Sequence, residues 1–164
     1  MKIKTKVLLV FLSLFFVHSS GFGQDKEVKI INRLMNNWHK AAADANANEF
    51  FDFMDDDCIY IGTDASERWT KQEVVQFAKA YFDKGKAWSF EPIERQVYFS
   101  GNKKTAWFNE TLNTWMGLCR SSGVLEKRKG AWKLKQYHLS VTVPNAKIQE
   151  FIRLVGTEAP QHNE

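Results

Sequence analysis

The chain has 164 residues, 44% hydrophobic and 26% charged, a composition typical of a globular protein and not of a disordered one. Its 23 Lys and Arg outnumber its 19 Asp and Glu, but three of these lysines lie in residues 1–24, which contain no acidic residue. The remaining 20 basic and 19 acidic side chains nearly balance. This excludes a general nucleic-acid binder, because phosphate contacts need a basic surface.

Residues 1–23 have the parts of a secretory signal peptide. Basic residues 1–6 precede the apolar run 7–17, and the small residues Gly21 and Gly23 favour cleavage before Gln24. The 11 residues of the run would extend about 16 Å as a helix, roughly half of a bilayer core, which disfavours a membrane anchor. We expect an exported protein, periplasmic or secreted, with no membrane segment after cleavage.

Export places Cys58 and Cys119 in an oxidising compartment. One disulfide and two buried free thiols are both consistent with their spacing, and neither cysteine has the neighbours of a zinc site.

The first part of the mature chain has helical patterns. Apolar residues recur every three or four positions over residues 25–45, which predicts an amphipathic helix. Asn48 can cap a short helix over residues 49–54, which the acidic residues 55–57 would end, and residues 58–61 resemble a strand.

A third helix is predicted after residue 70. Thr70 and Glu73 have the spacing of a capping box, and Gly85 is placed to end the helix. One face of this helix carries Phe77 and Tyr81 among its apolar residues.

The second part of the chain reads as an antiparallel meander followed by a short helix. The predicted strands cover residues 87–99, 104–116, 119–128 and 131–143. Residues 146–155 are expected to form the helix, and residues 156–164 a flexible tail.

Helices followed by a meander indicate an α+β domain over residues 24–155. Strands this long must curl over so small a core, with bulges expected near Pro92 and Gly117. The expected fold is therefore a cone, a curved antiparallel sheet wrapped around the N-terminal helices, with a hollow end that offers a pocket.

The last strand predicts polar residues inside this hollow. If Lys133 and Lys135 face water, strict alternation points Gln136, His138 and Ser140 inward. The outward face would then carry an apolar patch of Tyr137, Leu139, Val141 and Val143, to be covered by a second subunit or by the C-terminal segment. A bulge between Lys135 and His138 would exchange the two faces.

Glu110 lies on the same predicted strand face as Ala106, Phe108 and Leu112. A carboxylate in an apolar wall needs a partner or a raised pKa. We consider an ion pair with Arg120 first and an acid–base pair with His138 second. The opposite phase, with Trp107 and Asn109 lining the hollow, remains an alternative.

Several segments of the chain together resemble a SnoaL-like domain of the nuclear transport factor 2-like superfamily, over about residues 28 to 155. The resemblance rests on residues 60–64, 69–71, 105–108, 115–125, 132–134 and 138–145. It implies a pocket between the helices and the concave sheet, and often a dimer through the outer sheet face. It does not identify a reaction, because this fold hosts isomerases, dehydratases, hydrolases, scaffolds and binding domains.

Three functions are consistent with these patterns. The first is a domain that binds a small, largely apolar molecule. The second is a cofactor-free lyase or isomerase in which His138 or Glu110 moves a proton. The third is a dimeric scaffold. We expect no cofactor, no metal and no nucleic-acid partner. The candidate ligand-binding residues are Tyr60, Trp69, Tyr81, Trp115, Arg120, His138 and Ser140.

Overall fold

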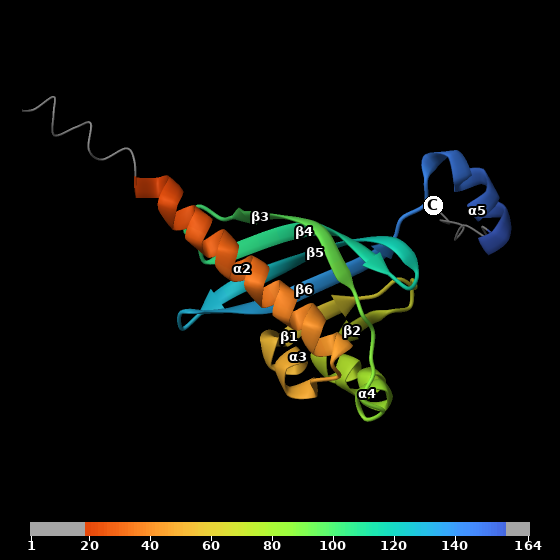
Figure 1. The fold of residues 1–164 in the computed structure, drawn as a ribbon, viewed down its shortest axis with the longest axis horizontal. Helices are drawn as coiled ribbons and strands as arrows, with labels where there is room; N and C mark the ends of the chain where they lie inside the picture. Colours follow the sequence, from red (N-terminus) through yellow and green to blue (C-terminus); the bar gives the residue numbers. More distant parts are fainter. Residues whose placement is uncertain (1–18, 157–164) are drawn as a thin grey trace, which may run out of the picture.

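The computed structural model describes residues 19–156 (Figure 1). The predicted signal peptide, residues 1–23, and the predicted tail, residues 156–164, lie outside the described residues except at their inner ends. No helix within residues 19–156 is long and apolar enough to cross a membrane.

The molecule is a curved sheet with helices on one side, as expected for an α+β cone. The helices are α2 (Ser19–Ala43), α3 (Ala47–Phe53), α4 (Lys71–Phe82), the 3-10 helix η1 (Asn145–Lys147) and α5 (Ile148–Val155). The strands are β1 (Met54–Ile61), β2 (Arg68–Thr70), β3 (Glu91–Phe99), β4 (Thr105–Thr114), β5 (Gly117–Arg128) and β6 (Ala131–Val141). Figure 1 shows α2 running diagonally across the sheet, with α3 and α4 at the β1–β2 end.

The six strands follow the order β2-β1-β6-β5-β4-β3. The predicted meander is confirmed as the antiparallel strands β3 to β6. β1 pairs with β6 in parallel, so the sheet is mixed rather than wholly antiparallel. The bulge expected near Pro92 is present, whereas the β4–β5 register is unbroken up to Gly117, which turns the hairpin with a φ of 89°.

Two helix starts depend on side-chain caps. The predicted capping box of Thr70 and Glu73 is present at the start of α4. At α3 the cap is Asn46, not Asn48: its side chain accepts a hydrogen bond from the Glu49 backbone N–H at 3.2 Å. The chain leaves α2 through Ala45 in the left-handed region (φ 52°), so the next helix begins earlier than predicted. Residues 55–57 also lie within β1 rather than ending the helix.

A bulge in β6 overturns the predicted orientation of its polar residues. Gln136 pairs with Val124, but Leu134 pairs with the next residue, Leu125, so Lys135 is the extra residue. An extra residue shifts the alternation by one. Tyr137 and Leu139 are therefore buried in the core and cannot form the predicted outer patch.

The same bulge turns Gln136, His138 and Ser140 to the outer side of the sheet. Gln136 is exposed, and His138 and Ser140 are half-buried. The prediction that these three side chains line the hollow is therefore wrong, and the alternative of a bulge in this strand is the one that the structure shows.

Both cysteines are buried free thiols, in β1 and β5, which decides between the two alternatives left by their spacing. Burial raises the pKa of the Cys58 thiol to about 12. Because both thiols are buried, neither residue is accessible for disulfide chemistry in the folded protein.

We expect Ellman's reagent to modify neither Cys58 nor Cys119 in the native protein at pH 8, and both after unfolding in guanidinium chloride. Burial prevents access, and the raised pKa of Cys58 adds to its protection. Rapid modification of a native thiol would contradict this packing.

Gly123 is required where β5 passes the core. A Cβ at this position would lie 2.6 Å from the Gln136 carbonyl oxygen and 2.7 Å from the Phe108 ring. We expect Gly123→Ala to lower the free energy of unfolding by about 1–3 kcal/mol, measured by denaturant titration. Gly101→Ala is the control, because no atom lies within 4 Å of its added Cβ. An equal effect of the two substitutions would contradict a steric role for Gly123.

Candidate functional site

A carboxylate is buried inside the cone. Glu110 is 1% exposed on the inner face of β4, the phase predicted from its apolar neighbours. Its Oε1 accepts a hydrogen bond from Ser121 Oγ at 2.7 Å and lies 2.9 Å from His39 Nε2. Its Oε2 accepts from Arg95 Nε at 2.7 Å. Glu110 thus joins β4 to α2, β3 and β5.

Neither partner predicted for Glu110 is its partner in the structure. Arg120 is exposed on the outer face, because strand alternation turns its neighbour Ser121 toward Glu110 instead. His138 is on the outer face because of the β6 bulge. The true partner Arg95 lies directly opposite Glu110 in the β3–β4 pairing, a relation that the predicted hairpin implied.

The network holds Glu110 in its ionised form. Burial acts to raise the pKa of Glu110, but the hydrogen bond from His39, the charges of His39 and Arg95 and the Ser121 hydrogen bond together lower it below 4.5. Arg95 also donates to the Asn32 backbone oxygen at 3.1 Å, a further link to α2. A doubly paired carboxylate of this kind anchors structure and is a poor proton carrier near neutral pH.

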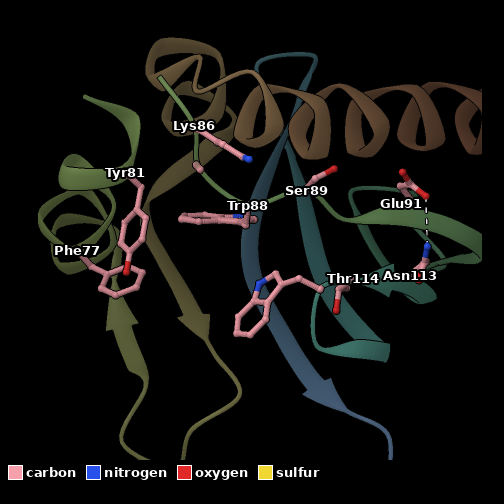
Figure 2. A pocket seen from close by; sticks show the side chains of 10 residues that line it. Phe77, Tyr81, Lys86, Trp88, Ser89, Glu91, Asn113 and Thr114 are labelled. Carbon is pink, nitrogen blue, oxygen red and sulfur yellow. Dashed lines mark hydrogen bonds between the residues drawn. The ribbon is translucent and has the colours of Figure 1, made fainter. Parts of the chain in front are cut away.

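The open end of the cone has an aromatic pocket of about 580 Å³. Phe77 and Tyr81 come from α4, Trp88 from the segment between α4 and β3, and Trp115 from the β4–β5 turn. Figure 2 shows the rings of Tyr81 and Trp88 bordering one space. The polar lining residues are Lys86, Ser89, Glu91, Asn113 and Thr114.

A smaller cavity of about 120 Å³ shares part of the lining and extends inward. Phe77, Trp88 and Trp115 line both spaces. The inner cavity adds Tyr60, whose ring stacks on Trp69 with centroids 6.2 Å apart. Burial raises the pKa of the Tyr60 hydroxyl well above its ordinary value, so this group is a neutral hydrogen-bond donor.

The predicted ligand-binding residues separate into two groups. Tyr60, Trp69, Tyr81 and Trp115 line the two cavities at the open end of the cone. Arg120, His138 and Ser140 instead share a hollow of about 220 Å³ on the outer sheet face, so no single pocket contains all seven residues.

Sequence reasoning missed Trp88 and Phe90 as lining residues. Both lie in residues 87–90, which were predicted as the start of a strand but have no regular structure. Two aromatic residues just before a strand were the available signal. His39 had none, because its contact with Glu110 depends on how α2 crosses the sheet.

Neither cavity contains an obvious proton-transfer pair. Their ionisable lining residues are Tyr60, Glu67, Tyr81, Lys86 and Glu91. No two of these described side chains form a hydrogen bond or an ion pair with each other. Within residues 19–156, no group of three or more His, Cys, Asp or Glu is placed to hold a metal ion. The aromatic side chains that line the two cavities are suited to contacting an apolar molecule.

Comparison with known proteins agrees with the resemblance found in the sequence. A model of the SnoaL-like domain family matches residues 31–144. No curated protein matches the chain.

Three similar solved structures show the same fold. An NTF2-like protein from Cytophaga hutchinsonii is 16% identical (TM-score 0.59, 70% of this chain and 97% of that one). A proposed dehydratase of the NTF2-like family from Streptomyces avermitilis is 15% identical (TM-score 0.62, 74% and 99%). The association domain of C. elegans CaMKII is 15% identical (TM-score 0.60, 73% and 98%). At these identities the likeness concerns the fold alone.

We expect Glu110→Gln to lower the free energy of unfolding by about 3–5 kcal/mol at pH 7, because it leaves Arg95 buried without its charged partner. The lowered pKa of Glu110 means that its contribution is complete above about pH 4.5 and is lost as the pH falls through the folded-state pKa. The difference between wild type and variant should therefore shrink in acid.

Denaturant titrations from pH 3 to pH 7 measure this dependence. Glu126→Gln is the matched control, because Glu126 pairs with Arg128 at the surface, where such pairs contribute about 0–1 kcal/mol. An equal cost for both variants, or a Glu110→Gln cost that does not change with pH, would contradict the anchoring role.

Proposed function

The chain belongs to the SnoaL-like domain family, and we propose that it is an exported protein that binds a small, flat, largely apolar molecule in the aromatic pocket. The observation that carries this proposal is the cluster of uncovered rings at the open end of the cone. Trp115 is 80% exposed, and Phe77 and Tyr81 are also exposed. A soluble domain rarely leaves such a cluster uncovered unless it binds something.

The size and lining of the pocket support a small ligand with one polar edge. A volume of about 580 Å³ lies within the usual range of 300–1,000 Å³ for ligand sites. Rings from three separate elements favour a flat molecule, since aromatic groups pair by offset stacking or edge-to-face contact. Lys86 and Glu91 at the lining can orient a polar substituent, and Asn113 holds Glu91 with a hydrogen bond of 3.4 Å (Figure 2).

The second candidate function is a cofactor-free lyase or isomerase. The buried His39–Glu110 pair favours it, with His39 taking the proton-transfer role first considered for His138. The fold likeness to a proposed dehydratase is consistent with it. Binding ranks first for two reasons. Phe90 lines the inner cavity next to His39, with ring centroids 6.3 Å apart, whereas His39 itself lines neither cavity. Glu110 already forms an ion pair with Arg95, so it is not free to transfer a proton.

Export and self-association complete the proposal. Export rests on the signal-peptide pattern of residues 1–23. Association into a homodimer is consistent with the fold likeness to an association domain.

We expect Trp88→Ala and Trp115→Ala each to weaken binding of 2-naphthol about 5- to 20-fold by isothermal titration calorimetry, because each removes a ring that contacts the ligand (~1–2 kcal/mol). Trp107→Ala is the control, since this tryptophan is exposed on the opposite sheet face. Decahydro-2-naphthol, which has the same polar group without the flat rings, should bind more weakly than 2-naphthol. A similar loss for Trp107→Ala, or equal binding of both alcohols, would contradict the proposal.

A further inference from the structure

The C-terminal helix α5 leaves its apolar side uncovered. Figure 1 shows it beyond the end of the sheet, away from the body of the molecule. Ile148, Phe151, Leu154 and Val155 recur at helical spacing and are all exposed, Leu154 at 85%. Its main contacts are with the adjoining η1. A helix of 8 residues is only marginally stable by itself in water. Packing of its apolar face against a partner would stabilise it.

The segment before α5 directs the helix away from its own pocket. Thr142 is held beside β5, because its backbone N–H and its Oγ1 donate to the Leu118 oxygen at 3.0 and 2.7 Å. Pro144 then fixes the backbone with φ −58°, and the Lys147 N–H donates to the Pro144 oxygen at 2.8 Å. η1 runs directly into α5, so these hydrogen bonds and Pro144 set the direction in which the helix leaves the sheet.

The segment that leads into α5 (residues 142–147) and the mouth of the pocket adjoin the same hairpin, β4–β5. Thr142 is bonded to Leu118, close to Trp115 in the β4–β5 turn. Trp115, Phe77 and Tyr81 are the exposed rings of the pocket. The chain therefore has two uncovered apolar surfaces at one end, a helix face and a groove, which is the pairing used when helices bind in grooves.

The charges of the two surfaces are complementary. Lys147 and Glu150 pair with each other at 3.0 Å. The segment of η1 and α5 therefore has a net positive charge from Arg153, which forms no ion pair with the described residues. The cavities are lined by Glu67, Glu91 and Lys86, two acidic residues and one basic, and none of the three forms an ion pair with a described residue.

We propose that α5 of one copy covers the aromatic pocket of a second copy, and that the exchange is reciprocal. Ile148, Phe151 and Leu154 then pack on the exposed outer edges of Phe77, Tyr81 and Trp115, while Trp88 and the inner cavity remain for the ligand. Two such contacts close a two-fold dimer, so the assembly ends at two chains. In a single chain the pocket is open to solvent. In the dimer, α5 of the partner closes the side that α4, Trp88 and the β4–β5 turn leave open. The ligand site is thus complete only in the dimer. This rests on the proposed function, because it takes the aromatic pocket as the site.

Paramagnetic NMR on mixed chains tests the exchange without any ligand. Glu150→Cys, an exposed position on α5 outside the proposed contact, carries a nitroxide label, which reacts there selectively because Cys58 and Cys119 are buried. The labelled chain is added in excess to ¹⁵N-labelled wild-type chain. Most ¹⁵N chains then pair with a spin-labelled chain in the two-fold dimer. The Trp115 indole N–H signal of the ¹⁵N chain is therefore expected to lose roughly half or more of its intensity. The signals of Trp107, on the outer sheet face, and of Trp38, buried in the core, should keep their intensity.

Two substitutions in the spin-labelled chain check the apolar contact. Adding Phe151→Ser should restore most of the Trp115 signal. Adding Gln149→Ser, an exposed polar change on the same helix, should not.

The proposal is overturned if Trp115 is unaffected, if Trp107 is affected instead, or if the loss requires the nitroxide and ¹⁵N in the same chain. It is also overturned if Phe151→Ser and Gln149→Ser act alike. Failure of 2-naphthol to bind would count against the proposed function and leave these NMR outcomes unchanged.

Discussion

The buried ion pair of Glu110 is the interaction on which the arrangement of this cone depends. A carboxylate in the interior is tolerated only with charged and hydrogen-bonding partners, and an unpaired one costs several kcal/mol, a large part of a domain's stability. Arg95, His39 and Ser121 supply those partners from β3, α2 and β5. The pairing therefore fixes how α2 crosses the sheet, and it fills the centre of the cone.

The bulge at Lys135 divides the remaining polar residues between the two sheet faces. By shifting the alternation of β6, it places Tyr137 in the core beside Trp38, with ring centroids 4.8 Å apart. It also moves His138 out of reach of Glu110. Among the described residues, the centre of the inner side is thus occupied by Glu110, paired with Arg95 and His39, and by aromatic rings, and this favours binding over proton transfer.

Much of the fold follows from local patterns, whereas the site depends on contacts between distant segments. The capping box at Thr70 and the buried phase of Glu110 were predictable, because each needs only the periodicity of one element. The Lys135 bulge could be raised only as an alternative, since one extra residue leaves no compositional mark. The parallel pairing of β1 with β6 and the contact of His39 with Glu110 join segments far apart in sequence.

The open aromatic end of the cone is the proposed binding site. The most direct test is a ¹H–¹⁵N titration of the wild-type protein with 2-naphthol, followed at the indole N–H signals of its 6 tryptophans. We predict shifts at Trp88 and Trp115. Trp107 on the outer face should stay unchanged, as should Trp38, whose indole N–H donates to the Phe50 oxygen. Shifts at Trp107 without shifts at Trp88 and Trp115 would contradict this account.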